Sequence, residues 1–203
     1  NMSAAVIDIS EYQDDDIIST ARESMGIGGV IIRLGLTYHG EPTMDDKFIT
    51  FVNKAVELGL PYGIYYYSKM TDSDWGLKEA QFINDKVYEL LNGQEPGMGV
   101  FWDMEDSLVQ YDGVYANLMN AIDTMSNWGF KKTGIYANKS YFETYMDLDD
   151  LANRGTRLWL AQYNDEPELI NERPNNNWVC WQYTDKANGM SLELHGNHIA
   201  SLH

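Results

Sequence analysis

Short apolar runs alternate with amphipathic stretches along this chain, and this alternation limits the folds that it can adopt. The first runs follow one another at intervals of about 30 to 40 residues, a spacing typical of βαβ units. Strands are predicted at residues 4–9, 29–34, 62–67, 99–104, 133–137, 158–163 and 178–183. Apolar residues recur at helical spacing over residues 45–58 and 74–91, which predicts helices between early strands. The pattern therefore indicates an α/β fold.

The last third of the chain follows a different pattern. After Trp159 the helical periodicity fades and the strands come closer together, so this part is predicted to be mostly β, with a loop at residues 167–177. The whole chain has 203 residues, of which 44% are hydrophobic, enough for the core of one domain. We expect one irregular α/β barrel over residues 1–203.

The charge composition restricts the partners that the chain can have. It contains 14 Lys and Arg against 31 Asp and Glu, giving a formal net charge of −17, which argues against nucleic acid and anionic membranes as partners. No signal peptide and no apolar run of about 18 residues is present, so no membrane span is predicted. Cys180 is the only cysteine, which excludes an intrachain disulfide and a cysteine zinc site.

The stretch GVFWDMEDS at residues 99–107 ends an apolar strand with a group of carboxylates. In a strand, Asp103 and Glu105 would point to the same side, with β-carbons about 6 to 7 Å apart. Repulsion between them and partial burial should raise the pKa of one carboxyl and leave the other ionised near neutral pH. Such a pair predicts acid/base chemistry if it opens onto a cleft.

Polar and aromatic residues also occupy the ends of the other predicted strands. The polar group consists of Asp8, Ser10, Arg33, Tyr65, Tyr67, Asp103, Glu105, Asn138, Gln162 and Gln182. The aromatic group consists of Tyr12, Tyr65, Tyr66, Tyr67, Trp102, Tyr136, Trp159, Tyr163, Trp181 and Tyr183. Because the carboxyl ends of parallel strands line the active face of such folds, these residues predict a glycan-binding cleft. About half of the aromatic residues should instead lie in the core, and Arg33 should pair with a barrel carboxylate.

A metal site is a second interpretation of the carboxylates. Asp8, Asp103 and Glu105 offer the oxygen ligands that magnesium and calcium prefer. The four histidines, His39, His195, His198 and His203, lie far from them in the sequence, which gives zinc little support. We therefore predict a site without a metal.

Several of these segments resemble glycoside hydrolase family 25, the Chalaropsis-type lysozymes of bacteria and phages. AVIDISEYQ at residues 5–13 is similar to the opening (V/I)D(V/I)S-x-(W/Y)Q signature of that family, and FWDMED at residues 101–106 is similar to its DxE strand. The segments VIIR (30–33), PYGIYYYS (61–68), GIY (134–136), LWLAQY (158–163) and WQYT (181–184) follow in family order. The resemblance extends from residue 4 to about residue 184.

The resemblance implies a fold and a reaction. The fold is an irregular TIM-like barrel of five β/α units followed by about three β-strands, in one catalytic domain. The reaction is hydrolysis of the β-1,4 bond between N-acetylmuramic acid and N-acetylglucosamine in bacterial peptidoglycan, outside the cell or at the wall. No cofactor is implied, and the protein is expected to be a monomer.

The resemblance also implies roles for individual residues. Glu105 would be the general acid, Asp103 would orient the substrate's N-acetyl group or stabilise the reactive intermediate, and Asp8 would tune the pair. We favour substrate-assisted catalysis, because a muramic substrate carries its own 2-acetamido nucleophile. The residues expected to bind substrate are Arg33, Tyr65, Tyr67, Tyr136, Gln162, Trp181, Gln182 and Glu193.

One segment departs from the family pattern. The family usually continues after WQYT with Gly-Asn-Val-Asp-x-Asn, whose Asp is a further active-site carboxylate, whereas no Asp follows Asp185 in this chain. If residues 192–194 form the matching strand, Glu193 replaces that Asp. If Gly196 and Asn197 are the anchor, Ile199 takes the position and the carboxylate is lost.

Two other function classes remain. A catalytically weakened descendant that binds cell-wall glycan is the alternative to a muramidase, and the retained Asp8, Asp103 and Glu105 favour the enzyme. A chitinase-like hydrolase would need a longer DxxDxDxE run, which residues 102–105 do not supply.

Overall fold

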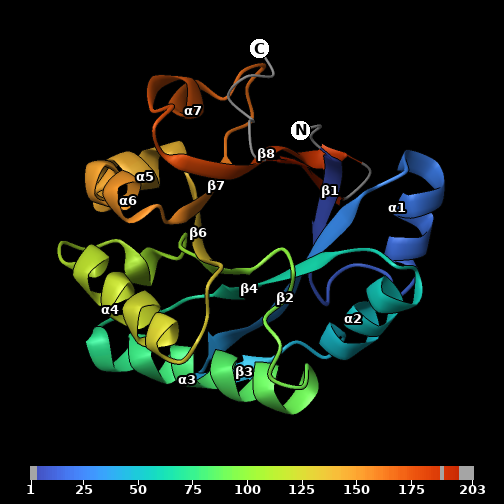
Figure 1. The fold of residues 1–203 in the computed structure, drawn as a ribbon, viewed down its shortest axis with the longest axis horizontal. Helices are drawn as coiled ribbons and strands as arrows, with labels where there is room; N and C mark the ends of the chain where they lie inside the picture. Colours follow the sequence, from blue (N-terminus) through green and yellow to red (C-terminus); the bar gives the residue numbers. More distant parts are fainter. Residues whose placement is uncertain (1–3, 188–189, 197–203) are drawn as a thin grey trace.

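The computed structural model describes residues 4–187 and 190–196, which form a closed barrel with helices around it (Figure 1). The barrel strands are, in spatial order, β1 (Ala4–Ile9), β9 (Met190–His195), β8 (Asn177–Ala187), β7 (Arg157–Ala161), β6 (Thr133–Asn138), β5 (Val100–Asp103), β4 (Tyr62–Tyr67) and β2 (Gly29–Tyr38). Pairing of β1 with β2 closes the ring, and β3 (Glu41–Met44) forms a hairpin with the outer part of β2. The predicted irregular α/β barrel is confirmed.

The helices cover the outside of the barrel, as Figure 1 shows. They are α1 (Ile17–Met25), α2 (Phe48–Glu57), α3 (Ser73–Leu90), α4 (Val114–Asn127), α5 (Lys139–Tyr145), α6 (Leu148–Arg154) and α7 (Glu168–Glu172), with a 3₁₀ turn at Ser107–Val109. The predictions at residues 45–58 and 74–91 correspond to α2 and α3. The loop prediction at residues 167–177 was wrong where α7 forms, because a five-residue helix is too short to show a period.

Successive side chains of a strand point to opposite faces, so the core has two parts, one inside the barrel and one between the barrel and the helices. On β5, Val100 and Trp102 point outward into the layer between the barrel and the helices. Phe101, between them, points inward and packs with Val6, Tyr65 and Trp159 in the barrel interior. The inner faces of the strands are thus apolar at their beginnings and polar at their carboxyl ends, where Asp103 follows Phe101.

Aromatic rings fill the barrel below its polar end. The Trp159 ring lies 4.3 Å from that of Tyr136, 5.3 Å from that of Phe101 and 6.0 Å from that of Tyr65, measured between centroids. Cys180 is fully buried in the same cluster, where burial raises the pKa of its thiol well above the usual range. The interior is therefore a packed plug, and the space for a ligand lies above it.

Strand β9 is antiparallel to both of its neighbours, unlike the parallel strands of the rest of the barrel. It places Glu193 opposite Val6 on β1 and opposite Gln182 on β8. The expectation that residues 192–194 form a closing strand is confirmed. Ile199, the alternative position for the family's Asp, lies outside the described residues.

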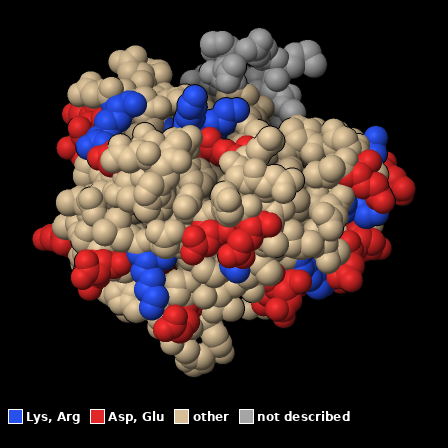
Figure 2. Space-filling model, turned by 60° about the horizontal axis from the view of Figure 1, so that its bottom comes forward, with Lys and Arg blue, Asp and Glu red and all other residues tan. Residues whose placement is uncertain are grey.

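Charged side chains are distributed over the surface. In Figure 2, Asp and Glu side chains spread across the visible face, and the Lys and Arg side chains stand among them. Within residues 4–187 and 190–196, no helix has the length and apolar character needed to cross a membrane.

Gly99 is a position where the fold requires glycine. Its φ of 91° lies in the left-handed region, and a β-carbon there would meet the Lys132 carbonyl oxygen and the Arg157 guanidinium. This guanidinium donates to the Met98 carbonyl oxygen at 2.9 Å and lies 5.5 Å from the centre of the Phe101 ring. The close approach of the Lys132 carbonyl and the Arg157 guanidinium to Gly99 therefore fixes the start of β5, the strand that carries Asp103.

We expect Gly99→Ala to destabilise the protein by about 2 kcal/mol or more, because it combines an unfavourable φ with a backbone clash. The midpoint of thermal unfolding should fall by roughly 4 to 8 °C or more for a domain of this size. Gly97→Ala is the matched control, since no heavy atom lies within 4 Å of the β-carbon position at Gly97. Equal midpoints for the two variants would show that Gly99 is not required.

Candidate active site

A cavity of about 220 Å³ opens at the carboxyl ends of the barrel strands. Its lining consists of Asp8, Tyr65, Asp103, Glu105, Tyr136, Trp159, Tyr163, Gln182, Asp185 and Ser191. The cavity brings together the three predicted catalytic carboxylates, which come from β1, β5 and the turn after β5. Its floor is the aromatic plug, with Trp159 at the centre.

Asp103 and Glu105 form the first carboxyl pair. Strand β5 ends at Asp103, so Glu105 belongs to the following turn, and the chain leaves the strand between them. Asp103 is 4% exposed, whereas Glu105 is exposed at the cavity. Burial raises the pKa of Asp103 well above its usual range, and the nearby Glu105 charge and a hydrogen bond to Glu105 raise it further. Asp103 therefore keeps its proton to a higher pH than a free aspartate does.

Asp8 and Glu193 form a second carboxyl pair. Glu193 is fully buried, and burial followed by the Asp8 charge raises its pKa well above the usual range. No protein N–H or O–H reaches the Glu193 oxygens in good hydrogen-bonding geometry, so an ionised Glu193 would be buried without compensation. A protonated Glu193 that donates to Asp8 removes this cost, and its bond opposes the rise in the pKa of Asp8 that burial causes.

Gln182 connects Asp8 to the aromatic side of the cavity. Its Nε2 donates to Asp8 Oδ2 at 2.7 Å. Its Oε1 accepts from Tyr136 Oη at 2.7 Å and from Tyr163 Oη at 2.6 Å. The amide thus fixes the orientation of one carboxylate and two phenol groups, all of which line the cavity.

Several predicted binding residues lie elsewhere. Arg33 is 8% exposed, and its Nε lies 2.9 Å from each carboxylate oxygen of Asp45, which confirms the expected pairing with a carboxylate. Tyr67 Oη donates to Asp106 Oδ1 at 2.9 Å. Trp181 Nε1 donates to the Gln162 carbonyl oxygen at 2.9 Å, and both side chains are buried. The cavity lining does not include five of the predicted binding residues, Arg33, Tyr67, Gln162, Trp181 and Glu193.

Two lining residues, Asp185 and Ser191, were absent from the sequence prediction. Asp185 lies on the outer part of β8, and Ser191 lies on β9 directly opposite Asp8. The position of Ser191 depends on the antiparallel register of β9, which periodicity alone does not give. Asp185 directly follows the WQYT segment, and this proximity was the only available signal.

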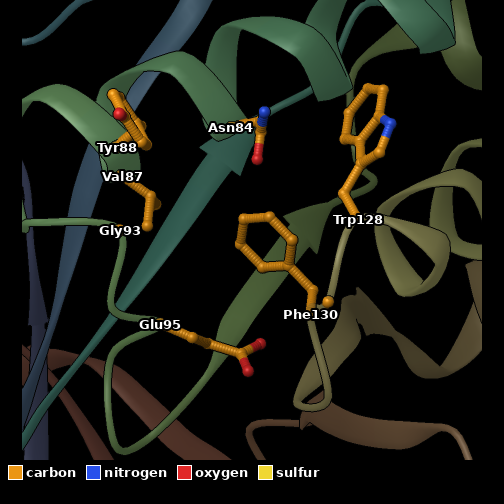
Figure 3. Close-up of a pocket in the computed structure, with 8 residues that line it drawn as sticks. Asn84, Val87, Tyr88, Gly93, Glu95, Trp128 and Phe130 are labelled. Atoms are coloured by element: carbon orange, nitrogen blue, oxygen red, sulfur yellow. The ribbon is translucent and has the colours of Figure 1, made fainter.

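A second hollow lies between the carboxyl-terminal ends of α3 and α4 (Figure 3). Tyr88 and Trp128 stand on either side of it, with Asn84 and Phe130 between them. Its one carboxylate, Glu95, accepts from the backbone N–H groups of Lys131 and Lys132 at 2.9 Å each. Because these bonds hold Glu95 in a structural role, the carboxyl pairs of the barrel remain the candidate active site.

Within the described ranges, no group of three or more His, Cys, Asp and Glu side chains is arranged to hold a metal ion. Asp8 instead shares hydrogen bonds with Glu193 and Gln182, and Asp103 with Glu105.

The sequence matches the family described as Glycosyl hydrolases family 25 over residues 7–191. The chain belongs to this family. The match confirms the resemblance found in the sequence and makes the chain a glycoside hydrolase domain. No curated protein sequence gave a significant match.

Solved structures with the same fold include three proteins of 18–23% sequence identity. The modular autolysin LytC from Streptococcus pneumoniae is 20% identical with a TM-score of 0.78, over 95% of this chain and 46% of LytC. The spore cortex lytic enzyme SleM from Clostridium perfringens is 23% identical with a TM-score of 0.75, over 98% and 69% of the two chains. A family GH25 lysozyme from Aspergillus fumigatus is 18% identical with a TM-score of 0.71, over 99% and 97%. This chain thus spans about half the length of LytC.

The buried carboxyl groups predict how stability depends on pH. Burial raises the pKa values of Asp8, Asp103 and Glu193, so the folded protein holds protons that the unfolded chain releases above about pH 4. The free energy of unfolding should therefore fall as pH rises from 5 to 8, by up to about 1.4 kcal/mol per pH unit for each proton retained.

Glu193→Gln tests the origin of this slope, because the amide keeps the shape and cannot ionise. Denaturant unfolding at several pH values should give a shallower slope for this variant than for the wild type. Glu23→Gln, at an exposed carboxylate on α1, is the control and should keep the wild-type slope. A wild-type slope in Glu193→Gln would mean that Glu193 does not hold a proton in the fold.

Proposed function

We propose that this protein is a peptidoglycan hydrolase, a 1,4-β-N-acetylmuramidase that acts on bacterial cell wall. The observation that carries the proposal is the cavity in which Asp8, Asp103 and Glu105 meet in a member of family 25. Two proteins of the same fold support the choice of substrate. LytC was solved with a synthetic peptidoglycan ligand, and the Cpl-1 endolysin was solved with a peptidoglycan analogue.

Glu105 is the proposed general acid. Asp103 and Glu105 share a proton at the cavity floor, and Glu105 is the exposed member of the pair. The proton held by Asp103 can pass to Glu105 along their hydrogen bond and from Glu105 to the glycosidic oxygen of a bound glycan, which leaves Asp103 ionised within the barrel. General acid catalysis of this kind contributes typically 10²- to 10⁴-fold to the rate.

Asp103 is proposed to orient the acetamido group of the substrate. Asp103 is only 4% exposed, which places it poorly for attack on the anomeric carbon, whereas a muramic substrate carries its own 2-acetamido nucleophile. The pair is therefore better suited to substrate-assisted catalysis, in which the 2-acetamido oxygen attacks the anomeric carbon. A carboxyl group at Asp103 can accept the amide N–H and stabilise the charge that develops on it.

Glu193 is proposed to act through Asp8 and not on the substrate. It lies beneath Asp8, fully buried, and is not part of the cavity lining. As a neutral donor it would hold Asp8 in place against Gln182 and oppose the rise in the pKa of Asp8. The pH dependence of stability described above tests whether Glu193 carries this proton.

Incubation with purified peptidoglycan tests the function. We expect the protein to release muropeptides that end in reducing N-acetylmuramic acid, because cleavage of the proposed bond frees the anomeric carbon of that sugar. Borohydride reduction followed by mass analysis identifies the new ends. Reducing N-acetylglucosamine ends would identify a different glycosidase, and binding without release would identify a glycan-binding protein.

Glu105→Gln should lower turnover by roughly 10²-fold or more, because the amide keeps the shape and cannot deliver a proton. Binding of glycan and the unfolding midpoint should stay close to the wild type. Glu23→Gln is again the matched control, with the same chemical change at an exposed site outside the cavity. A near-normal rate in Glu105→Gln would remove Glu105 from the proposed role.

A further inference from the structure

Asp185 gives the cavity a carboxylate that the proposed reaction does not use. It lies on the outer part of β8, is exposed, and lines the cavity beside Tyr163 and Gln182. Its charge reaches the reacting groups, since it contributes to raising the pKa values of Asp8 and Tyr163. It therefore acts on whatever occupies the cavity.

The described residues that line the cavity include no positive side chain to oppose this charge. Among the described residues that line it, four are carboxylic acids and none is Lys, Arg or His. The nearby Arg33 is buried and its Nε is bonded to Asp45. Arg33 still lowers the pKa of Asp103 through its charge, but the described lining residues offer a bound anion no cationic side chain to contact.

We propose that Asp185 makes the enzyme discriminate against N-acetylmuramic acid with a free lactyl carboxylate and favour glycan in which that carboxyl is an amide, as in peptide-substituted strands. This inference rests on the proposed function, because it concerns the sugar that would occupy the cavity during hydrolysis. It assigns Asp185 a role in specificity and no part in the chemical step.

The physical basis is the size of the cavity. A space of about 220 Å³ admits roughly one sugar unit, so a carboxylate on that sugar lies within about one Debye length, ~8 Å at physiological salt, of the lining acids. At that distance and an effective dielectric constant of about 20 to 40, one like charge weakens binding by roughly 5- to 30-fold. An amide carries no charge and avoids this repulsion.

The test uses two matched tetrasaccharides of alternating N-acetylglucosamine and N-acetylmuramic acid, one with free lactyl carboxylates and one with lactyl methylamides. The wild type should cleave the methylamide with a kcat/KM at least about 5-fold higher, and raising the salt from 0.05 to 0.5 M should reduce the ratio. Asp185→Asn should lower the ratio, because one of the acids that repel a lactyl carboxylate loses its charge. Asp185→Lys should lower it further, because a positive charge attracts the carboxylate, whereas the control Glu23→Gln should keep the wild-type ratio.

The outcomes separate this inference from the proposed function. Equal ratios in the wild type, Asp185→Asn and Asp185→Lys would overturn the role of Asp185 and leave the muramidase proposal intact. Cleavage of neither tetrasaccharide would count against the muramidase proposal. In that case calorimetric binding of both tetrasaccharides to the wild type and to Asp185→Asn decides the inference, and an unchanged preference overturns it.

Discussion

Closure of the barrel by β9 is the constraint on which the candidate site depends. The other barrel strands are parallel and each follows a connection along the outside, whereas β9 returns antiparallel between β8 and β1. This pairing brings Gln182 within 2.7 Å of Asp8, although the two residues are 174 positions apart in the sequence. It also sets Ser191 opposite Asp8 and turns Glu193 into the barrel. Without this strand, the cavity would be open on one side.

The inside of the barrel changes from apolar to acidic along the strand direction. Trp159 and its neighbouring rings exclude water from the lower part, and the carboxyl groups stand above them at the boundary. Burial at this boundary is what raises the pKa values of Asp103 and Glu193. Asp103 and Glu193 therefore keep their protons to higher pH, and each lies next to a second carboxyl group, Glu105 or Asp8. The same packing that stabilises the fold therefore prepares the site for proton transfer, at the expense of stability at higher pH.

The residues around the carboxyl pairs divide into those that hold them and those that face the ligand. Gln182 holds Asp8 together with two tyrosines, and Gly99 fixes the start of the strand that ends at Asp103. Glu105 and Asp185 are exposed in the cavity, so proton delivery and charge selection are assigned to them. A cavity of this kind can combine one reaction with a preference for neutral sugar substituents.

The sequence by itself determined the barrel and the position of its reactive end. The alternating pattern of Phe101, Trp102 and Asp103 specifies which side chains enter the barrel, since the period of a strand is two residues. The family motifs likewise follow in order along the chain. The tertiary structure decided what alternation cannot encode. The register of β9 made Glu193 a buried partner of Asp8, and Trp181 became part of the core because its strand face points outward. The short helix α7 and the place of Asp185 also depended on contacts between residues far apart in sequence, which local patterns do not contain.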